Sequence, residues 1–360
     1  MERVKKIAVV TVFALIIFGF AIGHLLLKDE TFSGAERRAL ASAPELSWSE
    51  VKNGNYFEDA ERYLLDHFPL RDSFRSLKAV TNHYVLNQKD SGGYYTADGH
   101  LSQLTGELDE KQVQLAVDKF NKIISGHPEM GAAYCAVIPD KNYFLAEPNG
   151  YPTMDYNTLF AQMQGVKAQY LNITGLLELE DYYTTDSHWK QERILPVAEF
   201  LCTAMGVEAA TGYTPHSLTG FRGVYSGHSA IPAPAETLTY LTNAATQNAL
   251  VQSYEHKEPM AVYTVEEFEG VDPYDVYLSG AEALISIENP DATSDRHLIL
   301  FRDSFGSALA PLLIDSYARI TLVDLRYINS QLLDTMVDFT DADVLFLYST
   351  TLLNTGSILK

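Results

Sequence analysis

Two short polar segments contain the side chains that could carry out acyl-transfer chemistry. The first reads Asp186-Ser187-His188-Trp189, and the second, much later in the chain, reads Asp303-Ser304-Phe305. A carboxylate can fix the tautomer of an imidazole, and that imidazole can take the proton of a serine hydroxyl. Side chains two positions apart lie on one face of an extended segment. We therefore expect Asp186 and His188 to act together on Ser304.

The position of Ser304 between two regular elements supports this interpretation. The apolar run 297–301 precedes it, and the small and apolar residues 306–313 follow it. This pattern predicts a strand that ends in a turn and opens a helix, where backbone N–H groups point at a developing oxyanion. The alternative is structural, because Asp-Ser is also a routine helix cap and a single histidine can be a hydrogen-bonded structural residue.

Apolar segments alternate with helical patterns over much of the chain. Strands are expected at 132–138, 175–179, 298–301, 320–324 and 344–348, and helices at 108–124, 158–171, 189–205, 307–317 and 329–338. This order predicts an α/β fold with a mostly parallel sheet covered on both faces. Ligands then bind beyond the carboxyl ends of the strands, where Ser304 falls. Residues 207–280 are richer in Gly, Pro, Ser, Thr and Tyr, and we interpret them as a β-rich insertion that could shape a substrate groove.

The N-terminal segment has the length and composition of a membrane anchor. Residues 7–27 contain no Asp, Glu, Lys or Arg and would span roughly 30 Å as a helix, about the thickness of the bilayer core. Arg3, Lys5 and Lys6 precede them, so the positive-inside rule places residues 1–6 in the cytoplasm and the rest outside. A cleaved signal peptide is the alternative, although its apolar core would be shorter.

Residues 28–90 are expected to form an extracellular linker and a helical brace, or equally to pack on the main domain, which would occupy residues 91–360. The formal net charge of −21 argues against a nucleic-acid partner. Cys135 and Cys202 fall in a predicted strand and a predicted helix, so buried free thiols are favoured over a disulfide. The spacing of a zinc site is absent from the sequence, and we expect no metal or other cofactor.

Several motifs together resemble the DHHW family of Gram-positive bacteria. They are Asp66-His67-Phe68-Pro69-Leu70-Arg71-Asp72, Ile138-Pro139-Asp140-Lys141-Asn142, Tyr182-Tyr183 before Asp186-Ser187-His188-Trp189, Asp303-Ser304-Phe305-Gly306 and Asp324-Leu325-Arg326-Tyr327. The resemblance runs from about Phe32 to the C-terminus. That family is similar to the SGNH-like, alginate O-acetyltransferase group of exported polysaccharide-modifying proteins. One departure is Ser187, since the second letter of the name-giving motif is usually His; the first and third letters, which would be the acid and the base, are intact.

The resemblance implies an SGNH-hydrolase-like three-layer fold and a role for each motif. Ser304 would be the nucleophile, His188 the general base and then acid, and Asp186 the orienting carboxylate. The partners implied are a cell-envelope polysaccharide and a membrane-bound O-acyltransferase that supplies acyl groups. The function expected is therefore O-acyl transfer to such a polymer or ester hydrolysis. The alternative is a non-catalytic glycan-binding or scaffolding protein of the envelope.

Six further residues are candidates for the oxyanion hole or for substrate contact. The backbone N–H of Phe305, or that of Ser304 itself, is one donor by the helix-terminus argument. Gly280 is a second, because family members tend to have a glycine-rich turn there. Arg326 and Tyr348 lie near strand ends at the same edge; otherwise Arg326 pairs with Asp324 and Tyr348 is a rim aromatic. Asp140 and Asn142 follow a strand and would line the same cleft, or else cap a turn.

Overall fold

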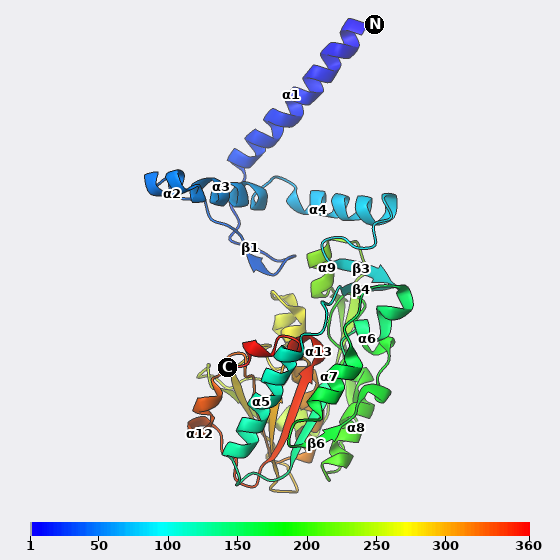
Figure 1. Ribbon diagram of the computed structural model, residues 1–360, viewed down its shortest axis with the longest axis vertical. Coiled ribbons are helices and arrows are strands. Elements are labelled where there is room, and N and C mark those ends of the chain that lie inside the picture. The colour runs from blue at the N-terminus through cyan, green and yellow to red at the C-terminus, as the bar shows by residue number, and fades with distance from the viewer. Residues whose placement is uncertain (1) are drawn as a thin grey trace. The chain divides into compact units, whose positions relative to one another are not determined.

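The structure is a computed structural model that describes residues 2–360 (Figure 1). The chain divides into two compact units. One comprises the residues up to Gly92 together with Ser226–Pro232, and the other comprises Gly93–Tyr225 and Ala233–Lys360. The limits of the cytoplasmic tail, anchor, brace and main domain stay predictions.

The larger unit is built on a seven-stranded sheet with the order β6-β5-β13-β11-β12-β10-β9. Neighbouring strands from β6 to β12 are parallel, while β10 is antiparallel to both β12 and β9. The strands are β5 (Ala133–Ile138), β6 (Gln169–Leu171), β9 (Leu250–Ser253), β10 (Leu284–Glu288), β11 (His297–Arg302), β12 (Arg319–Val323) and β13 (Asp343–Ser349). The mostly parallel sheet is thereby confirmed. Segments that follow β5, β13, β11 and β12 all emerge at one edge, the edge at which α/β proteins bind ligands.

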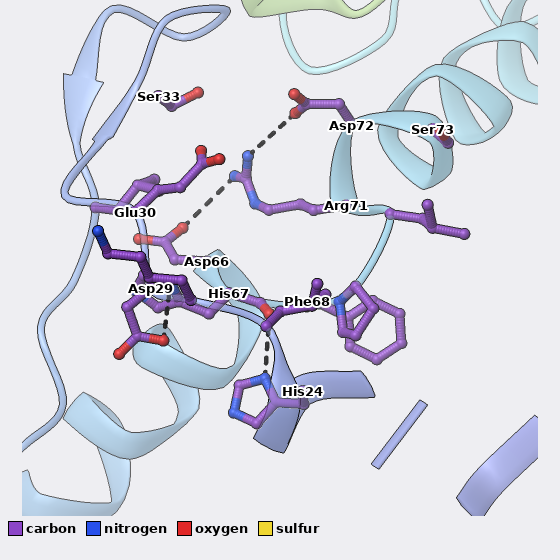
Figure 2. A pocket seen from close by; sticks show the side chains of 15 residues that line it. His24, Asp29, Glu30, Ser33, Asp66, His67, Phe68, Arg71, Asp72 and Ser73 are labelled. Carbon is purple, nitrogen blue, oxygen red and sulfur yellow. Dashed lines mark hydrogen bonds and ion pairs between the residues drawn. The ribbon is translucent and has the colours of Figure 1, made fainter. Parts of the chain in front are cut away.

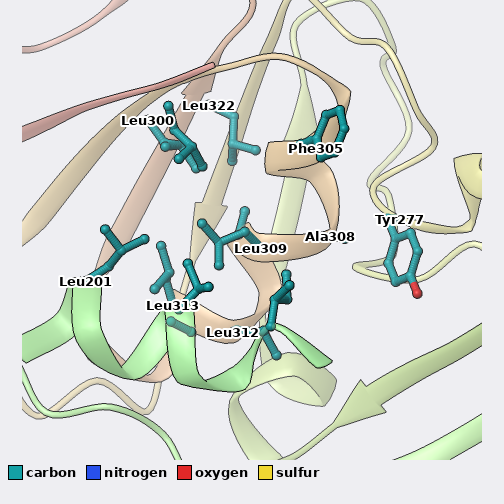
Figure 3. Packing of buried hydrophobic residues seen from close by; sticks show 14 of the residues in the cluster. Leu201, Tyr277, Leu300, Phe305, Ala308, Leu309, Leu312, Leu313 and Leu322 are labelled. Atoms are coloured by element: carbon teal, nitrogen blue, oxygen red, sulfur yellow. The ribbon is translucent and has the colours of Figure 1, made fainter. Parts of the chain in front are cut away.

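Helices cover both faces of this sheet, which confirms the three-layer arrangement. Leu298 and Leu300 of β11 belong to one hydrophobic cluster, and Ile299 and Phe301 belong to the other, as the alternation of strand side chains requires. On the first face lie α8 (Leu195–Ala204), α11 (Ser304–Leu309) and the 3₁₀ segment η8 (Ala310–Ser316) (Figure 3). On the second face lie α5 (Glu110–Gly126), α7 (Tyr156–Met163), α12 (Leu333–Met336) and α13 (Thr350–Leu353).

Five predicted elements differ in the structure. The helices expected at 307–317 and 329–338 are α-helical only over Ser304–Leu309 and Leu333–Met336, with 3₁₀ segments beside them. The helix expected at 158–171 ends at Met163, where Gly165 turns the chain, and 169–171 form the edge strand β6. The strand expected at 175–179 is replaced by 3₁₀ turns η3 (Thr174–Leu176) and η4 (Leu179–Asp181), the second closed by a capping box. The helix expected at 189–205 begins only at Leu195, because Pro196 fits the first turn of a helix and not its interior.

The insertion contains one antiparallel hairpin, β7 (Thr214–Phe221) with β8 (Glu236–Thr242). Strand β9 belongs to the main sheet, so the β-rich part is narrower than 207–280. The remaining elements of this stretch are α9 (Val224–Ser229), α10 (Ala244–Asn248) and the 3₁₀ segments η6 (Val265–Glu269) and η7 (Pro273–Val276). Short elements elsewhere in the chain are the hairpin β3 (Tyr94–Ala97) with β4 (His100–Gln103), α6 (Asn142–Leu145), η2 (Glu147–Asn149), η5 (Gln191–Arg193), η9 (Ser330–Leu332) and η10 (Gly356–Ile358).

The smaller unit contains the N-terminal helices. These are α1 (Glu2–Leu26), α2 (Trp48–Asn53), α3 (Asn55–Asp66) and α4 (Arg71–Val80), which continues as a π-helix over Thr81–Val85; β1 (Phe32–Ser33) pairs with β2 (Arg38–Ala39). Helix α1 is long and apolar enough to cross a membrane, as predicted. The motif at 66–72 joins α3 to α4: Asp66 accepts hydrogen bonds from the Arg38 guanidinium, and Arg71 pairs with Glu36. Figure 2 shows Asp66 and Arg71 among the residues that line a pocket of this unit.

The two cysteines are free and buried, as predicted, and they lie in different hydrophobic clusters on opposite faces of the sheet. Burial raises the pKa of the Cys135 thiol to about 12, so this thiol is not reactive at neutral pH.

Candidate active site

The structure brings Asp186, His188 and Ser304 into one hydrogen-bonded chain. The Nε2 atom of His188 lies 2.7 Å from the Ser304 hydroxyl oxygen, and its Nδ1 atom lies 2.6 Å from Asp186 Oδ1. Asp186 and His188 are buried, whereas Ser304 is partly exposed. The serine can therefore meet a substrate while the imidazole and the carboxylate behind it are shielded from water.

The turn between β11 and α11 presents Ser304 as the first residue of its helix. Asp303 caps that helix: its Oδ1 accepts the Phe305 amide at 3.1 Å, and its Oδ2 accepts the Ser349 amide at the end of β13 at 2.8 Å. The chain then turns back so closely that a Cβ on Gly306 would lie 2.5 Å from Arg302 Cβ. A glycine is thus needed here, and the cap fixes the serine at the carboxyl edge of the sheet.

The Asp186 segment is a tight turn and not the extended segment that we predicted. It runs between Tyr182 and Trp189, which form an isolated antiparallel bridge. Within it, Asp186 Oδ1 accepts both the backbone N–H of His188 at 3.0 Å and the ring Nδ1. This Asx turn, and not the alternation of a strand, aligns the carboxylate with the imidazole.

Trp189 links this turn to the helix that begins at Ser304. The side chain is fully buried, and its Nε1 donates to the Phe305 carbonyl at 3.1 Å. Gln191 adds a second link, since its Nε2 donates to Ala308 O at 2.8 Å. The distance between His188 and Ser304 is therefore supported by hydrogen bonds between the two segments as well as by their own contact.

Lys141 and Glu236 hold the residues just before Asp186. Lys141 is almost completely buried, and its Nζ donates to Tyr183 O at 2.9 Å and Thr184 O at 3.2 Å. Glu236 of β8 accepts the amides of Thr184 and Thr185 at 2.7 and 2.8 Å. Burial lowers the pKa of Lys141 to about 7, although the nearby carboxylates of Asp186 and Glu236 act in the opposite direction.

The segment after β7 contacts the carboxylate itself. The amide of Val224 donates to Asp186 Oδ2 at 2.8 Å, so the second carboxylate oxygen is also bonded. Gly223 lies so close that a Cβ there would be 2.3 Å from Asp186 Cβ. The insertion therefore positions the acid of the candidate triad.

Two aromatic rings enclose the imidazole. Tyr274 stacks on His188 with ring centroids 3.9 Å apart and an interplanar angle of 9°. Phe305 lies against it at 4.9 Å in a tilted arrangement. Among residues 2–360, the Tyr274 hydroxyl finds no hydrogen-bond partner, although it is buried. Tyr274 thus contacts His188 through the face of its ring and not through its hydroxyl.

Of the three amides proposed from the sequence as oxyanion donors, those of Phe305 and Gly280 are already engaged. The Phe305 amide is bonded to the Asp303 cap, and the Gly280 amide donates to Tyr277 O at 3.2 Å within a turn. Gly280 itself has φ of +83° and accepts from Arg302 Nη2 at 3.3 Å. The amide of Ser304, as the first residue of α11, has no acceptor within its own helix. It is the donor that this geometry leaves for an oxyanion.

Neither Arg326 nor Tyr348 is placed for substrate contact. Arg326 forms a bidentate pair with Asp324, with Nε to Oδ1 at 2.9 Å and Nη2 to Oδ2 at 2.5 Å. Tyr348 is buried in the cluster under α5, where it stacks on Phe120 with centroids 5.2 Å apart. Tyr348 lies on the face of the sheet opposite to α11, so the prediction of a rim aromatic was also wrong.

Asp140 and Asn142 have structural partners. Asp140 accepts from the Asn142 amide, from Tyr156 and from Thr350, and its burial raises its pKa. Asn142 accepts from Tyr95 at 2.5 Å and donates to Gln103 O at 2.7 Å, which ties it to the β3–β4 hairpin. The turn-capping alternative fits both residues.

Sequence reasoning missed the supporting residues of the site. Lys141 was expected only to line the cleft with Asp140 and Asn142, and Glu236, Gly223 and Tyr274 were not considered at all. Among residues 2–360, no group of three or more His, Cys, Asp or Glu side chains is arranged to hold a metal ion.

Comparison with known proteins agrees with the resemblance seen in the sequence. The crystal structure of a DHHW family protein from Eubacterium siraeum matches with a TM-score of 0.56 at 20% identity, over 73% of this chain and 91% of that one. PatB1 from Bacillus cereus matches with a TM-score of 0.58 at 17% identity, over 74% of this chain and 98% of PatB1. A PatB1 structure with a sulfonyl adduct matches at 18% identity with the same TM-score.

The O-acetyltransferase domain of Pseudomonas putida AlgJ matches more weakly, with a TM-score of 0.44 at 12% identity, over 73% of this chain and 92% of that one. No family model and no curated protein sequence matches the chain. The DHHW family protein and PatB1 share the fold of this chain, and the expected fold is confirmed.

Proposed function

We propose that this protein is a membrane-anchored extracellular O-acyltransferase, or a related esterase, that acts on a cell-envelope polysaccharide through Ser304, His188 and Asp186. The observation that carries the proposal is the position of His188, whose two ring nitrogens contact the Ser304 hydroxyl and the Asp186 carboxylate. Acyl transfer is the chemistry that this order of groups performs in unrelated folds.

In the proposed reaction, Ser304 Oγ attacks the carbonyl carbon of the acyl donor as its proton passes to His188 Nε2. Asp186 stabilises the imidazolium that forms, and the Ser304 amide donates to the oxyanion. The tetrahedral intermediate collapses, the leaving oxygen takes the proton from His188, and the acyl group remains on Ser304. A sugar hydroxyl, or water in an esterase, then attacks this ester with His188 as base, and the proton returns to Ser304 Oγ.

The acyl donor must be available on the outer side of the membrane. Acetyl-CoA is a cytoplasmic thioester, so a transferase working outside requires a membrane protein that delivers acyl groups. We propose a membrane-bound O-acyltransferase as this partner. The basic residues Arg3, Lys5 and Lys6 at the start of α1 support the orientation that this scheme needs, with the N-terminus in the cytoplasm.

A covalent probe tests the proposal directly. A fluorophosphonate should label the detergent-solubilised full-length protein, and Ser304→Ala should abolish the labelling. A sulfonyl fluoride is a useful second probe, since a PatB1 structure carries a sulfonyl adduct. Ser307→Ala is the matched control, because Ser307 is a buried serine of the same helix. Labelling should persist in Ser307→Ala, and labelling that survives Ser304→Ala would refute the assignment.

The alternative of a non-catalytic envelope protein makes an opposite prediction. In cells, Ser304→Ala and His188→Ala proteins would then keep full biological activity. Loss of O-acylated polymer in both variants, with unchanged melting temperatures, would support the enzyme.

A further inference from the structure

Helices α3 and α4 carry a continuous exposed apolar surface. On α3, Phe57 and Leu64 lie on one face, seven positions apart, and are 62 and 50% exposed; no residue within Asn55–Asp66 is buried. Leu70, the residue before α4, and Leu77 of α4 are 68 and 60% exposed. Exposed apolar residues at such spacing on consecutive helices form a patch of the kind that marks an interaction surface.

The opposite side of each helix is polar or already packed. On α3, Arg62 pairs with Glu58 and Asp59. On α4, Arg75 donates to Gly227 O and His228 O at 3.0 and 3.1 Å, and Ala79 is buried. Both helices are therefore amphipathic, and most of the apolar side is exposed in the structure.

This apolar surface is continuous with the last turns of α1. The Phe20 ring stacks on Phe68 with centroids 5.1 Å apart and meets Phe74 edge-on at 5.6 Å. His24 Nδ1 lies 3.1 Å from His67 O, as Figure 2 shows. Phe20 precedes the end of α1 at Leu26 by about 9 Å of helix rise. Phe68 and Phe74 thus lie at the level of Phe20, a residue inside the candidate membrane span.

We propose that α3 and α4 lie in the membrane–water interface on the extracellular face of the bilayer. The apolar side chains inserted among the lipids would be Phe57, Leu64, Phe68, Phe74 and Leu77. If α1 spans the bilayer, the rings that touch Phe20 lie just below the outer edge of the hydrocarbon. Interfacial helices bury their apolar face by about 5–10 Å at this boundary, which agrees with the rise between Phe20 and Leu26. This inference depends on α1 as the anchor and not on the acyl chemistry.

The charges of these helices indicate hydrophobic and not electrostatic attachment. Helix α3 carries four carboxylates against Arg62, and α4 carries Asp72 against Arg71, Arg75 and Lys78, so the two helices together have a net charge of only −1. Arg71 and Arg75 are moreover paired with Glu36. A surface of this kind gains nothing from anionic lipid headgroups. Membrane contact of the apolar side should therefore be insensitive to salt.

Fluorescence quenching in proteoliposomes tests the proposal. Single cysteines would be introduced in the full-length chain at Leu64 or Leu77 and, as matched controls on the polar sides, at Arg62 or Asp72, whose side chains are each 67% exposed. Each is labelled with bimane; the native cysteines are buried. Resistance to carbonate extraction verifies insertion of α1, and unchanged melting temperatures verify folding.

We expect a lipid with a nitroxide near the top of its acyl chain to quench bimane at Leu64 and Leu77 about threefold or more over the controls. Aqueous iodide should show the reverse order, in low and high salt alike. Equal quenching on both sides of the helices would overturn the proposal. Protection of Leu64 and Leu77 from both quenchers would also overturn it, because a protein would then cover the apolar side.

Discussion

At the scale of single residues, every oxygen of Asp186 has a defined donor. Oδ1 accepts the amide and the ring nitrogen of His188, and Oδ2 accepts the Val224 amide. The Ser187 hydroxyl also donates to Oδ1, at 3.4 Å, so both oxygens face donors and neither leaves a place for an NH₂ group. The carboxylate is thus held in one orientation, and the tautomer of His188 with the proton on Nδ1 follows from it.

Asp186→Asn should therefore disable the site while keeping its shape. The NH₂ group of asparagine must face either the Val224 amide or His188, and facing His188 selects the tautomer that cannot accept the Ser304 proton. We expect kcat/KM for an aryl acetate to fall by about 10⁴-fold, as the analogous change does in serine proteases. Hydrolysis assays of the solubilised full-length protein measure this, and a loss of less than about tenfold would contradict the role of Asp186.

The ring of Tyr274 should matter more than its hydroxyl. Stacking at 3.9 Å limits rotation of the His188 imidazole, and the hydroxyl makes no hydrogen bond among residues 2–360. Tyr274→Phe should leave kcat within about twofold of wild type, while Tyr274→Leu should lower it by about tenfold, in line with the energy of an aromatic pair. Equal kcat values for the two variants would show that stacking does not orient the base.

At the scale of elements, three separate parts of the fold converge on the turn that contains Asp186. The segment after β5 contributes Lys141, β8 contributes Glu236, and the segment after β7 contributes the Val224 amide. The turn has no regular secondary structure of its own, so these contacts define its conformation. They resemble the supporting hydrogen bonds that functional sites need to keep their geometry.

Lys141 should make the stability of this region depend on pH. Its pKa is lowered by burial to about 7, against 10.5 for the free side chain. Between these values the unfolded chain binds one proton more than the folded chain, so stability rises with pH by about 1.4 kcal/mol per unit. The melting temperature of the wild type relative to Lys141→Met should therefore increase from about pH 7 to about pH 10. A constant difference would mean that Lys141 keeps its charge in the fold.

The elements also show what local patterns can and cannot predict. Strand β11 and the helix after it were evident, because an apolar run gives way to Asp-Ser and a helical composition. The hydrogen bonds that hold the Asp186 turn were not evident, since Glu236 and Val224 lie far along the chain in the irregular insertion. Tyr348 was misassigned because both faces of β13 are apolar, so its alternation carries no information on which face meets the site.

At the scale of the whole molecule, the order of apolar strands and helices was sufficient to predict the fold class. The edge strands were not predictable: β6 is short, and β9 and β10 pair antiparallel within or after the irregular insertion. Length and charge pattern identified α1, whereas the apolar sides of α3 and α4 acquire meaning only from their contacts with Phe20.

The anchor should place the larger unit outside the cell. Arg3, Lys5 and Lys6 oppose translocation of the N-terminus, so protease added to intact protoplasts should digest the C-terminal unit and spare an N-terminal cytoplasmic tag. Permeabilised protoplasts, in which the tag is lost, provide the control. Protection of the C-terminal unit in intact protoplasts would reverse the orientation and exclude an extracellular polymer as substrate.

The central claim is that Ser304 carries the acyl group between donor and acceptor. Rapid acid quenching of the full-length protein with an aryl acetate, followed by peptide mass spectrometry, measures this directly. We predict an acetyl group on the peptide that contains Ser304 in the wild type, a large reduction in His188→Ala and none in Ser304→Ala. Acetylation of another residue at the same rate in Ser304→Ala would contradict the account.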